Sequence, residues 1–122
     1  MCGISGYCGQ NIETEKLVKM TEAISRRGPD DFGYHESNGI GFGFRRLSII
    51  DLSNGHQPMS NEDETIWVML NGEIYDFNRI KEELLTLGHK FRTKSDTEVI
   101  IHGYEQWGEE VFKKIDGMFA IA

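Results

Sequence analysis

The segment 39–50, GIGFGFRRLSII, constrains the fold more than any other part of the chain. Successive side chains of a β-strand point to opposite faces, so Phe42 and Phe44 share one face and Gly41 and Gly43 share the other. A face made of glycines lets another layer approach the strand closely. The glycines do not form a phosphate-binding loop, because no Lys-Ser or Lys-Thr pair follows them. The segment therefore predicts a sheet, as one strand or two, with a closely packed layer.

Other stretches also read as strands. The segments 2–8, 65–70 and 118–122 are short and apolar or rich in β-branched residues, and 89–93 is a shorter candidate. The segment 65–70 runs directly into Asn71-Gly72, a pair typical of tight turns, so we expect a turn there. The segment RRGPDDFG at 26–33 is expected to be a tight turn that leaves a helix.

Segments with helical periodicity lie between these predicted strands in the sequence. One helix is predicted over 14–27, with an apolar face of Leu17, Met20 and Ile24. A second is predicted between an N-cap at Asp76 and a stop at Gly88. Its apolar positions are Phe77, Ile80, Leu84 and Leu87.

A third helix is predicted to open with a capping box, Ser95-x-x-Glu98. Its buried stripe would contain Ile100, Tyr104 and Trp107, and a short fourth helix would follow over 109–114. Strands mixed with amphipathic helices predict a domain of the α+β class.

Composition narrows the function classes. The chain has 122 residues, 39% hydrophobic, and a net charge of −7, which fits one modest globular domain. The acidic balance argues against nucleic acid or an anionic membrane as partner. No apolar run is long enough to span a membrane and no export segment is recognisable, so we expect a cytoplasmic protein. Since the chain ends inside the apolar segment 118–122, we also expect it to be a truncated fragment.

The cysteines and histidines do not indicate a disulfide or a metal centre. With 2–8 in a strand, Cys2 and Cys8 lie about 20 Å apart, beyond disulfide reach. The histidines are scattered without ligand spacing, so no metal site is predicted. They are His35, His56, His89 and His102.

The first residues, Met1-Cys2-Gly3, have a chemical interpretation of their own. Removal of Met1 would leave Cys2 with a thiol and a free α-amine, which has a pKa of about 7.7–8.0 in solution. The amine could then take the thiol proton, giving a nucleophile with its own base. Taken alone, an accidental cysteine at a passive N-terminus is the simpler interpretation.

Five segments in order now support the nucleophile: MCGISG, RRGPDDFG, RRLSIID, NGEIYDF and SDTEV. Together they resemble the N-terminal glutaminase domain of glutamine-hydrolysing asparagine synthases, which are class II glutamine amidotransferases. The resemblance covers residues 1–122. It implies a four-layer αββα sandwich of the N-terminal-nucleophile hydrolases, here C-terminally truncated. RLSIID distinguishes this group from the sugar-phosphate amidotransferases, which resemble it less in that segment.

The resemblance implies a role for each matching residue. Cys2 would attack the side-chain amide of L-glutamine, and the Asn71 amide and Gly72 N–H would form the oxyanion hole. Arg46 would bind the α-carboxylate, because its planar fork suits a carboxylate. The residues expected to complete the glutamine site are Glu73 and Asp96, for the α-ammonium, and the backbone near Leu47 and Ile50. Without the resemblance, Arg46 would be read as a surface ion pair and Asp96 as an N-cap.

The match has departures and limits. Arg26 and Phe44 stand where family members often carry histidine, which affects only local packing. The synthetase domain is absent, so ATP and Mg are implied only for that missing part, and no cofactor is assigned to this chain. With Met1 attached, the Cys2 nitrogen is an amide, and we expect the unprocessed chain to be close to inactive.

Several alternatives stay open. The ammonia acceptor could be aspartate, the default, or a sugar acid of polysaccharide synthesis. The chain could also be an inactive truncated fragment or a glutamine-binding sensor without turnover. A homodimer is open as well, in addition to the synthetase domain of the parent protein.

Overall fold

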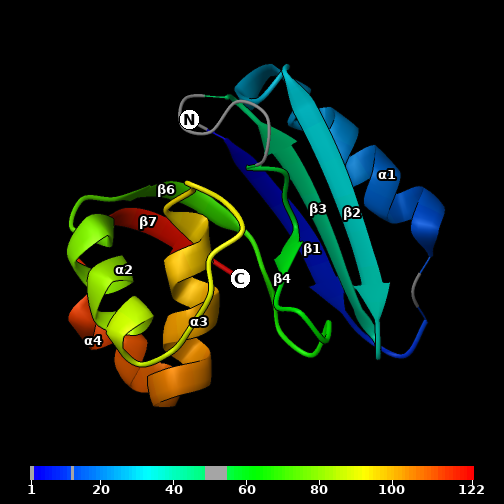
Figure 1. Cartoon of the computed structure of the whole chain (residues 1–122). Helices are drawn as coiled ribbons and strands as arrows, with labels where there is room; N and C mark the ends of the chain where they lie inside the picture. The colour runs from blue at the N-terminus through cyan, green and yellow to red at the C-terminus, as the bar shows by residue number, and fades with distance from the viewer. Residues whose placement is uncertain (1, 12, 49–54) are drawn as a thin grey trace.

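The computed structural model describes residues 2–11, 13–48 and 55–122, and its elements are shown in Figure 1. The α-helices are α1 (Thr14–Ala23), α2 (Phe77–Thr86), α3 (Thr97–Trp107) and α4 (Val111–Lys114), with 3-10 turns at Ser25–Arg27 and Gly108–Glu110. The strands are β1 (Gly3–Cys8), β2 (Asp31–Ser37), β3 (Ile40–Arg46), β4 (Met59–Ser60), β5 (Trp67–Val68), β6 (Leu70–Ile74) and β7 (Gly117–Ile121). Helices and strands are mixed along the chain, so the domain is of the predicted α+β class.

The largest sheet has the antiparallel order β1-β3-β2, and α1 packs on it. The glycine face of β3 lies under this helix. A Cβ added at Gly41 would lie 3.4 Å from the Leu17 side chain, and one at Gly43 would overlap the Thr21 hydroxyl. The prediction of a close layer on this strand is therefore confirmed.

The strand β2 was missed, because RRGPDDFG was read as a turn. Only its first part turns, and from Asp31 the chain pairs along the whole of β3. A hairpin turn at Asn38-Gly39, both with positive φ, joins the two strands. Phe32 is 53% exposed, so β2 has no continuous apolar face from which its strand could be recognised.

The helix predicted over 14–27 is shorter and differently packed. α1 ends at Ala23, and a 3-10 turn follows. Met20 is exposed, whereas Thr21 is buried and bonds the Ser5 hydroxyl at 2.9 Å. A threonine can take an apolar place here because the Leu17 carbonyl and Ser5 satisfy its hydroxyl.

The turn predicted at Asn71-Gly72 is wrong. Both residues lie inside β6, where they pair with Ala120 and Phe119 of the antiparallel strand β7. Gly72 has a φ of +154°, and a Cβ added there would lie 2.6 Å from the Cα of Phe119. The glycine therefore allows two strands to approach, and it does not reverse the chain.

The remaining helices cover β6 and β7 with an apolar core that includes Ile74, Ile80, Leu84 and Ile101. The second predicted helix is confirmed as α2, with two differences. Its Asp76 side chain accepts a hydrogen bond from the Asp116 N–H at 2.9 Å and pairs with Arg79 instead of capping the helix. Leu87 follows the helix and is half exposed.

Three predictions before and within α3 are wrong. The segment 89–93 is irregular, with no strand assigned to it. The capping box does not form, because Glu98 accepts hydrogen bonds from the N–H groups of Arg92 and Thr93. In the stripe, Tyr104 is 41% exposed and Ile101 is buried in its place. The short helix α4, near the position predicted for the fourth, is confirmed.

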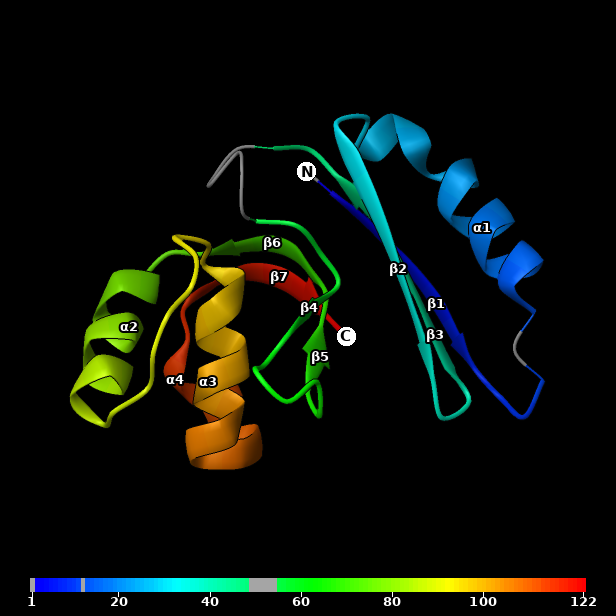
Figure 2. The ribbon, with the colours of Figure 1, turned by 45° about the vertical axis from the view of Figure 1, so that its right-hand side comes forward.

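Figure 2 shows how these parts are arranged. α1 lies on the outer side of the β1-β3-β2 sheet, and β6, β7 and the helices α2 and α3 lie on the other side of that sheet. β1 and β6 approach each other, which brings the start of the chain near the start of β6. Among the described residues, no helix combines the length and apolar character that crossing a membrane would require.

Candidate active site

A pocket lies where the start of β1, the end of β3, the strand β6 and the N-terminus of α3 meet. Its lining residues are Cys2, Arg46, Leu47, Gly55, Gln57, Leu70, Gly72, Glu73, Ser95, Asp96, Thr97 and Met118. Most of the residues predicted for glutamine chemistry are therefore brought together, from segments up to about ninety positions apart in the sequence.

Two predicted residues are not part of this set. Asn71 lies in β6 next to Gly72, but it does not line the pocket. Its Oδ1 is buried and has no hydrogen-bond partner among the described residues. Ile50 lies outside the described residues.

Backbone groups of two other segments hold Cys2. The N–H of Leu47 donates to the Cys2 Sγ at 3.4 Å, and the thiol lies 3.7 Å from the carbonyl oxygen of the same residue. The Nε of Arg27 donates to the Cys2 carbonyl at 2.9 Å. Leu47 therefore contacts the thiol, a role that its sequence position did not indicate.

Arg46 is the buried cation of the pocket. It is the last residue of β3, and only 6% of it is exposed. The preceding turn packs on its backbone: Asp30 donates its N–H to the Arg46 carbonyl at 3.0 Å, and a Cβ at Gly28 would lie 2.5 Å from the Arg46 nitrogen. The segment RRGPDDFG thus packs against the backbone of the pocket arginine through Gly28 and the backbone of Asp30.

Asp96 is the buried anion. It directly precedes α3, is 6% exposed, and accepts a hydrogen bond from the N–H of Ile74 at 3.0 Å. Burial raises the pKa of the Asp96 carboxyl above its ordinary value, and the nearby charge of Glu73 acts in the same direction. A cation bound between the two acids would relieve both effects.

Gln57 is a lining residue that the sequence did not reveal. Its Oε1 accepts the N–H of Leu70 at 2.7 Å, and its Nε2 donates to the Thr97 hydroxyl at 3.0 Å. The side chain is buried and joins the start of β6 to the start of α3. It comes from the irregular segment before β4, where no periodic pattern marks a buried residue.

The pocket therefore contains a thiol, a buried guanidinium and a buried carboxylate on separate walls. A zwitterionic ligand could place its carboxylate on Arg46 and its ammonium on Asp96 and Glu73. A reactive group on the same ligand would then face Cys2. Such an arrangement suits nucleophilic attack on an amino acid side chain.

Comparison with known proteins agrees with this chemistry. A family model described as "Glutamine amidotransferase domain" matches residues 1–122. The chain is 48% identical over 126 residues to "Asparagine synthetase [glutamine-hydrolyzing] 1" of Bacillus subtilis (strain 168), covering 98% of this chain and 20% of that protein. It is 41% identical over 124 residues to "Asparagine synthetase [glutamine-hydrolyzing] 3" of Arabidopsis thaliana, covering 98% of this chain and 21% of that protein.

The chain thus spans about a fifth of the length of the curated relatives that it matches. The family match extends over the whole of the present sequence, including all five segments that predicted it. The chain belongs to the glutamine amidotransferase domain family.

Proposed function

We propose that this chain hydrolyses the side-chain amide of L-glutamine through a thioester on Cys2. The observation that carries the proposal is the pocket in which the Cys2 thiol faces walls that contain Arg46 and Asp96. A cavity of about 100 Å³ is smaller than the 300–1,000 Å³ of drug-sized sites, so it suits an amino acid better than a nucleotide.

The proposed reaction begins once Met1 has been removed. The Cys2 α-amine takes the thiol proton, and the thiolate attacks the amide carbon of glutamine. The carbon–nitrogen bond then breaks, and the leaving nitrogen takes the proton from the α-ammonium and departs as ammonia. Water cleaves the resulting γ-glutamyl thioester, which releases glutamate and restores the thiol.

Substrate selection follows from the two charged ends of glutamine. Arg46 binds the α-carboxylate bidentately, while Asp96 and Glu73 bind the α-ammonium. Leu47 holds the sulfur through its N–H at 3.4 Å, so it acts on the nucleophile. The backbone near Ile50 belongs to the proposal only as predicted from the family pattern.

The oxyanion hole is proposed to consist of the Gly72 N–H and the Asn71 side-chain amide. Gly72 lines the pocket, which supports its part. Since none of the residues that the structure describes donates to the Asn71 Oδ1, turning its NH₂ group toward the pocket breaks no bond between them and that oxygen. Loss of one such donor raises the reaction barrier by about 3–4 kcal/mol.

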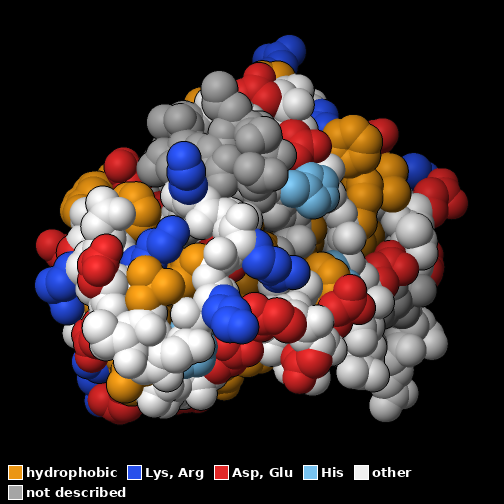
Figure 3. All heavy atoms as spheres, in the orientation of Figure 1, with side chains coloured by type: hydrophobic (Ala, Val, Ile, Leu, Met, Phe, Trp, Pro, Cys, Tyr) orange, Lys and Arg blue, Asp and Glu red, His pale blue; other side chains and the backbone are white. Residues whose placement is uncertain are grey.

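The role of the whole protein rests on the names of relatives. We propose that the ammonia serves ATP- and Mg-dependent conversion of aspartate to asparagine in a synthetase domain outside this chain. Amidation of a sugar acid is the alternative acceptor reaction. The four-layer sandwich, a cytoplasmic location, an incomplete C-terminal side and a homodimer stay predictions. Figure 3 shows basic and acidic side chains interspersed on one face, which favours a small-molecule substrate over nucleic acid.

Glutaminase assays on chains with and without Met1 test the proposal. We expect glutamate and ammonia from the processed chain only, and none from processed Cys2→Ser. Cys8→Ser is the matched control, since Cys8 is an exposed free thiol outside the pocket. Equal, strong activity with Met1 retained would refute the role of the α-amine.

A glutamine sensor without turnover is the second candidate, because the charged walls alone could bind the amino acid. Titration with a glutamine-like alkylating agent separates the two. Stoichiometric labelling of Cys2 supports the enzyme, whereas reversible binding without labelling supports the sensor.

A further inference from the structure

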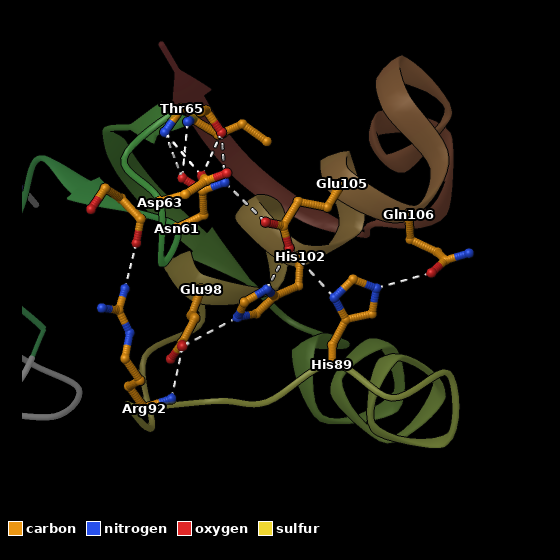
Figure 4. A network of polar contacts seen from close by, with 11 residues as sticks. Asn61, Asp63, Thr65, His89, Arg92, Glu98, His102, Glu105 and Gln106 are labelled. Atoms are coloured by element: carbon orange, nitrogen blue, oxygen red, sulfur yellow. Dashed lines mark hydrogen bonds and ion pairs between the residues drawn. The ribbon is translucent and has the colours of Figure 1, made fainter.

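A second polar cluster lies away from the pocket, at the C-terminal half of α3. His102 and Glu105 come from this helix, and His89 comes from the segment between α2 and α3. Figure 4 shows the three side chains converging. Thirteen positions separate the two histidines in the sequence, which is not a ligand spacing.

The separations within the cluster suit a metal ion. The Nδ1 of His102 lies 2.8 Å from the Oε2 of Glu105, and the Nδ1 of His89 lies 3.4 Å from the same oxygen. Each residue offers one ligand atom, and these atoms all lie within 4.8 Å of one another. Ligands about 2.0–2.2 Å from a tetrahedral zinc ion are about 3.3 Å apart, so small side-chain movements are enough.

In all three residues, the polar atom that would not bind the ion also has a hydrogen-bond partner. The Nε2 of His102 lies 3.3 Å from the Glu98 carboxylate, and the Nε2 of His89 lies 2.9 Å from the Gln106 side-chain oxygen. The second oxygen of Glu105 accepts a hydrogen bond from Asn61 at 3.0 Å. When a metal-binding histidine uses one nitrogen for the metal, its other N–H normally donates to such an acceptor.

Charge favours a cation in this place. With both imidazoles neutral, Glu98 and Glu105 give the cluster a net charge of −2. His102 and Glu98 are only 2% and 1% exposed, so water screens these charges poorly. A single divalent ion would balance both carboxylates.

We propose that His89, His102 and Glu105 bind a divalent transition metal, of which Zn²⁺ fits the ligand set best. Two imidazoles and one carboxylate are a known zinc ligand set, and the fourth position would take water. His89 and Glu105 have side-chain exposures of 17% and 24%, which gives the ion a route from solvent. The ion would fasten α3 to the segment that connects it with α2.

Calorimetric titration of the full chain with Zn²⁺, without glutamine, tests the proposal independently of the glutaminase. We expect one ion per chain, bound at least tenfold more weakly by His89→Gln and by Glu105→Gln. His56→Gln is the matched control, because His56 also pairs with a carboxylate, Asp31 at 2.7 Å, but has no second imidazole beside it. Circular dichroism checks that each variant is folded.

Substitution by Co²⁺ adds a readout that does not depend on any variant. The proposed site predicts the visible spectrum of a tetrahedral cobalt ion without a sulfur-to-cobalt charge-transfer band. A strong band of that kind would place the ion on Cys2 or Cys8 and overturn the proposal. Absence of binding, or equal affinity in the wild type and in His89→Gln, would also overturn it.

Discussion

Asp96 and Glu98 are two acids at the start of the same helix, and both are almost fully buried. Their pKa values are shifted in opposite directions. Burial raises the pKa of Asp96 and outweighs its backbone hydrogen bonds, which include the one from the Ile74 N–H. Burial acts in the same direction on Glu98, but its many hydrogen bonds outweigh it and lower the pKa to about 2. Its donors are the N–H groups of Arg92 and Thr93, the Thr93 hydroxyl and His102.

The difference separates a structural acid, Glu98, from Asp96, which is proposed to bind the substrate. Glu98 has its hydrogen-bonding capacity filled by the protein, so it fixes the segment before α3. Asp96 lines the pocket next to the second acid Glu73, and its hydrogen bonds are too weak to outweigh its burial. Burial of a carboxylate therefore indicates a ligand site only when its donors are too few.

The largest effect is expected from Glu98→Gln. The substitution removes the charge and turns an NH₂ group toward donors that need an acceptor. Breaking a buried charged network of this kind costs about 3–5 kcal/mol in the free energy of unfolding. Urea denaturation measures it, with the exposed Glu109→Gln as control, which should change stability by less than about 0.5 kcal/mol. Equal, small losses would show that Glu98 is not structural.

Asp96→Asn, in contrast to Glu98→Gln, should reduce activity and leave stability unchanged. The asparagine oxygen can still accept the Ile74 N–H, so the fold should stay as stable as the wild type. The charge proposed to bind the α-ammonium is lost, and loss of a buried charge partner costs about 2–5 kcal/mol in binding. We expect the kcat/KM for glutamine to fall by about 10²-fold, which corresponds to about 2.7 kcal/mol. Unchanged kinetics together with a destabilised chain would make Asp96 a structural residue.

A smaller effect is expected from Thr93→Val, which removes one donor to Glu98. The Thr93 hydroxyl lies 2.6 Å from a Glu98 oxygen and accepts the Ser95 N–H at 3.1 Å. Loss of these bonds should cost about 1–2 kcal/mol in unfolding free energy. Thr14→Val is the matched control, because its 2.9 Å bond to Glu36 is exposed and water can replace it. If both variants lose the same stability, burial of the bond has no influence.

The smallest expected effect is a dependence on pH. The pKa of Asp96 is raised above its ordinary 3.8, so the folded chain holds this proton more tightly than the unfolded chain. As pH rises from about 4 through the folded pKa, the wild type should lose stability relative to Asp96→Asn. Thermal unfolding of both proteins across this range measures the gap, and a gap that moves in favour of the wild type would contradict the assignment.

Local patterns predicted what depends on local geometry. Gly41 and Gly43 indicated the close approach of another layer, and the helices α2 and α3 were found from their periodicity. The pairing of β6 with β7 could not be read locally, so Asn71-Gly72 looked like a turn. Ser95-x-x-Glu98 failed as a capping box because the preceding segment folds back and supplies better donors to the glutamate.

The candidate site likewise combines residues that could be predicted with contacts that could not. Cys2, Arg46 and Asp96 came from the family pattern, and the structure brings them to one pocket. The contact of the Leu47 N–H with the thiol and the convergence of His89 with His102 depend on tertiary folding. No spacing rule reveals such contacts, because each joins segments whose separation has no periodic meaning.

Gln57 shows how contacts that depend on tertiary folding limit the tolerance of a position to mutation. Its amide satisfies one donor and one acceptor on different elements, so neither glutamate nor leucine can replace both functions. A library randomised at this position and selected for folded protein should therefore return glutamine almost alone. A polar residue in an irregular segment can be as hard to exchange as a leucine of the core.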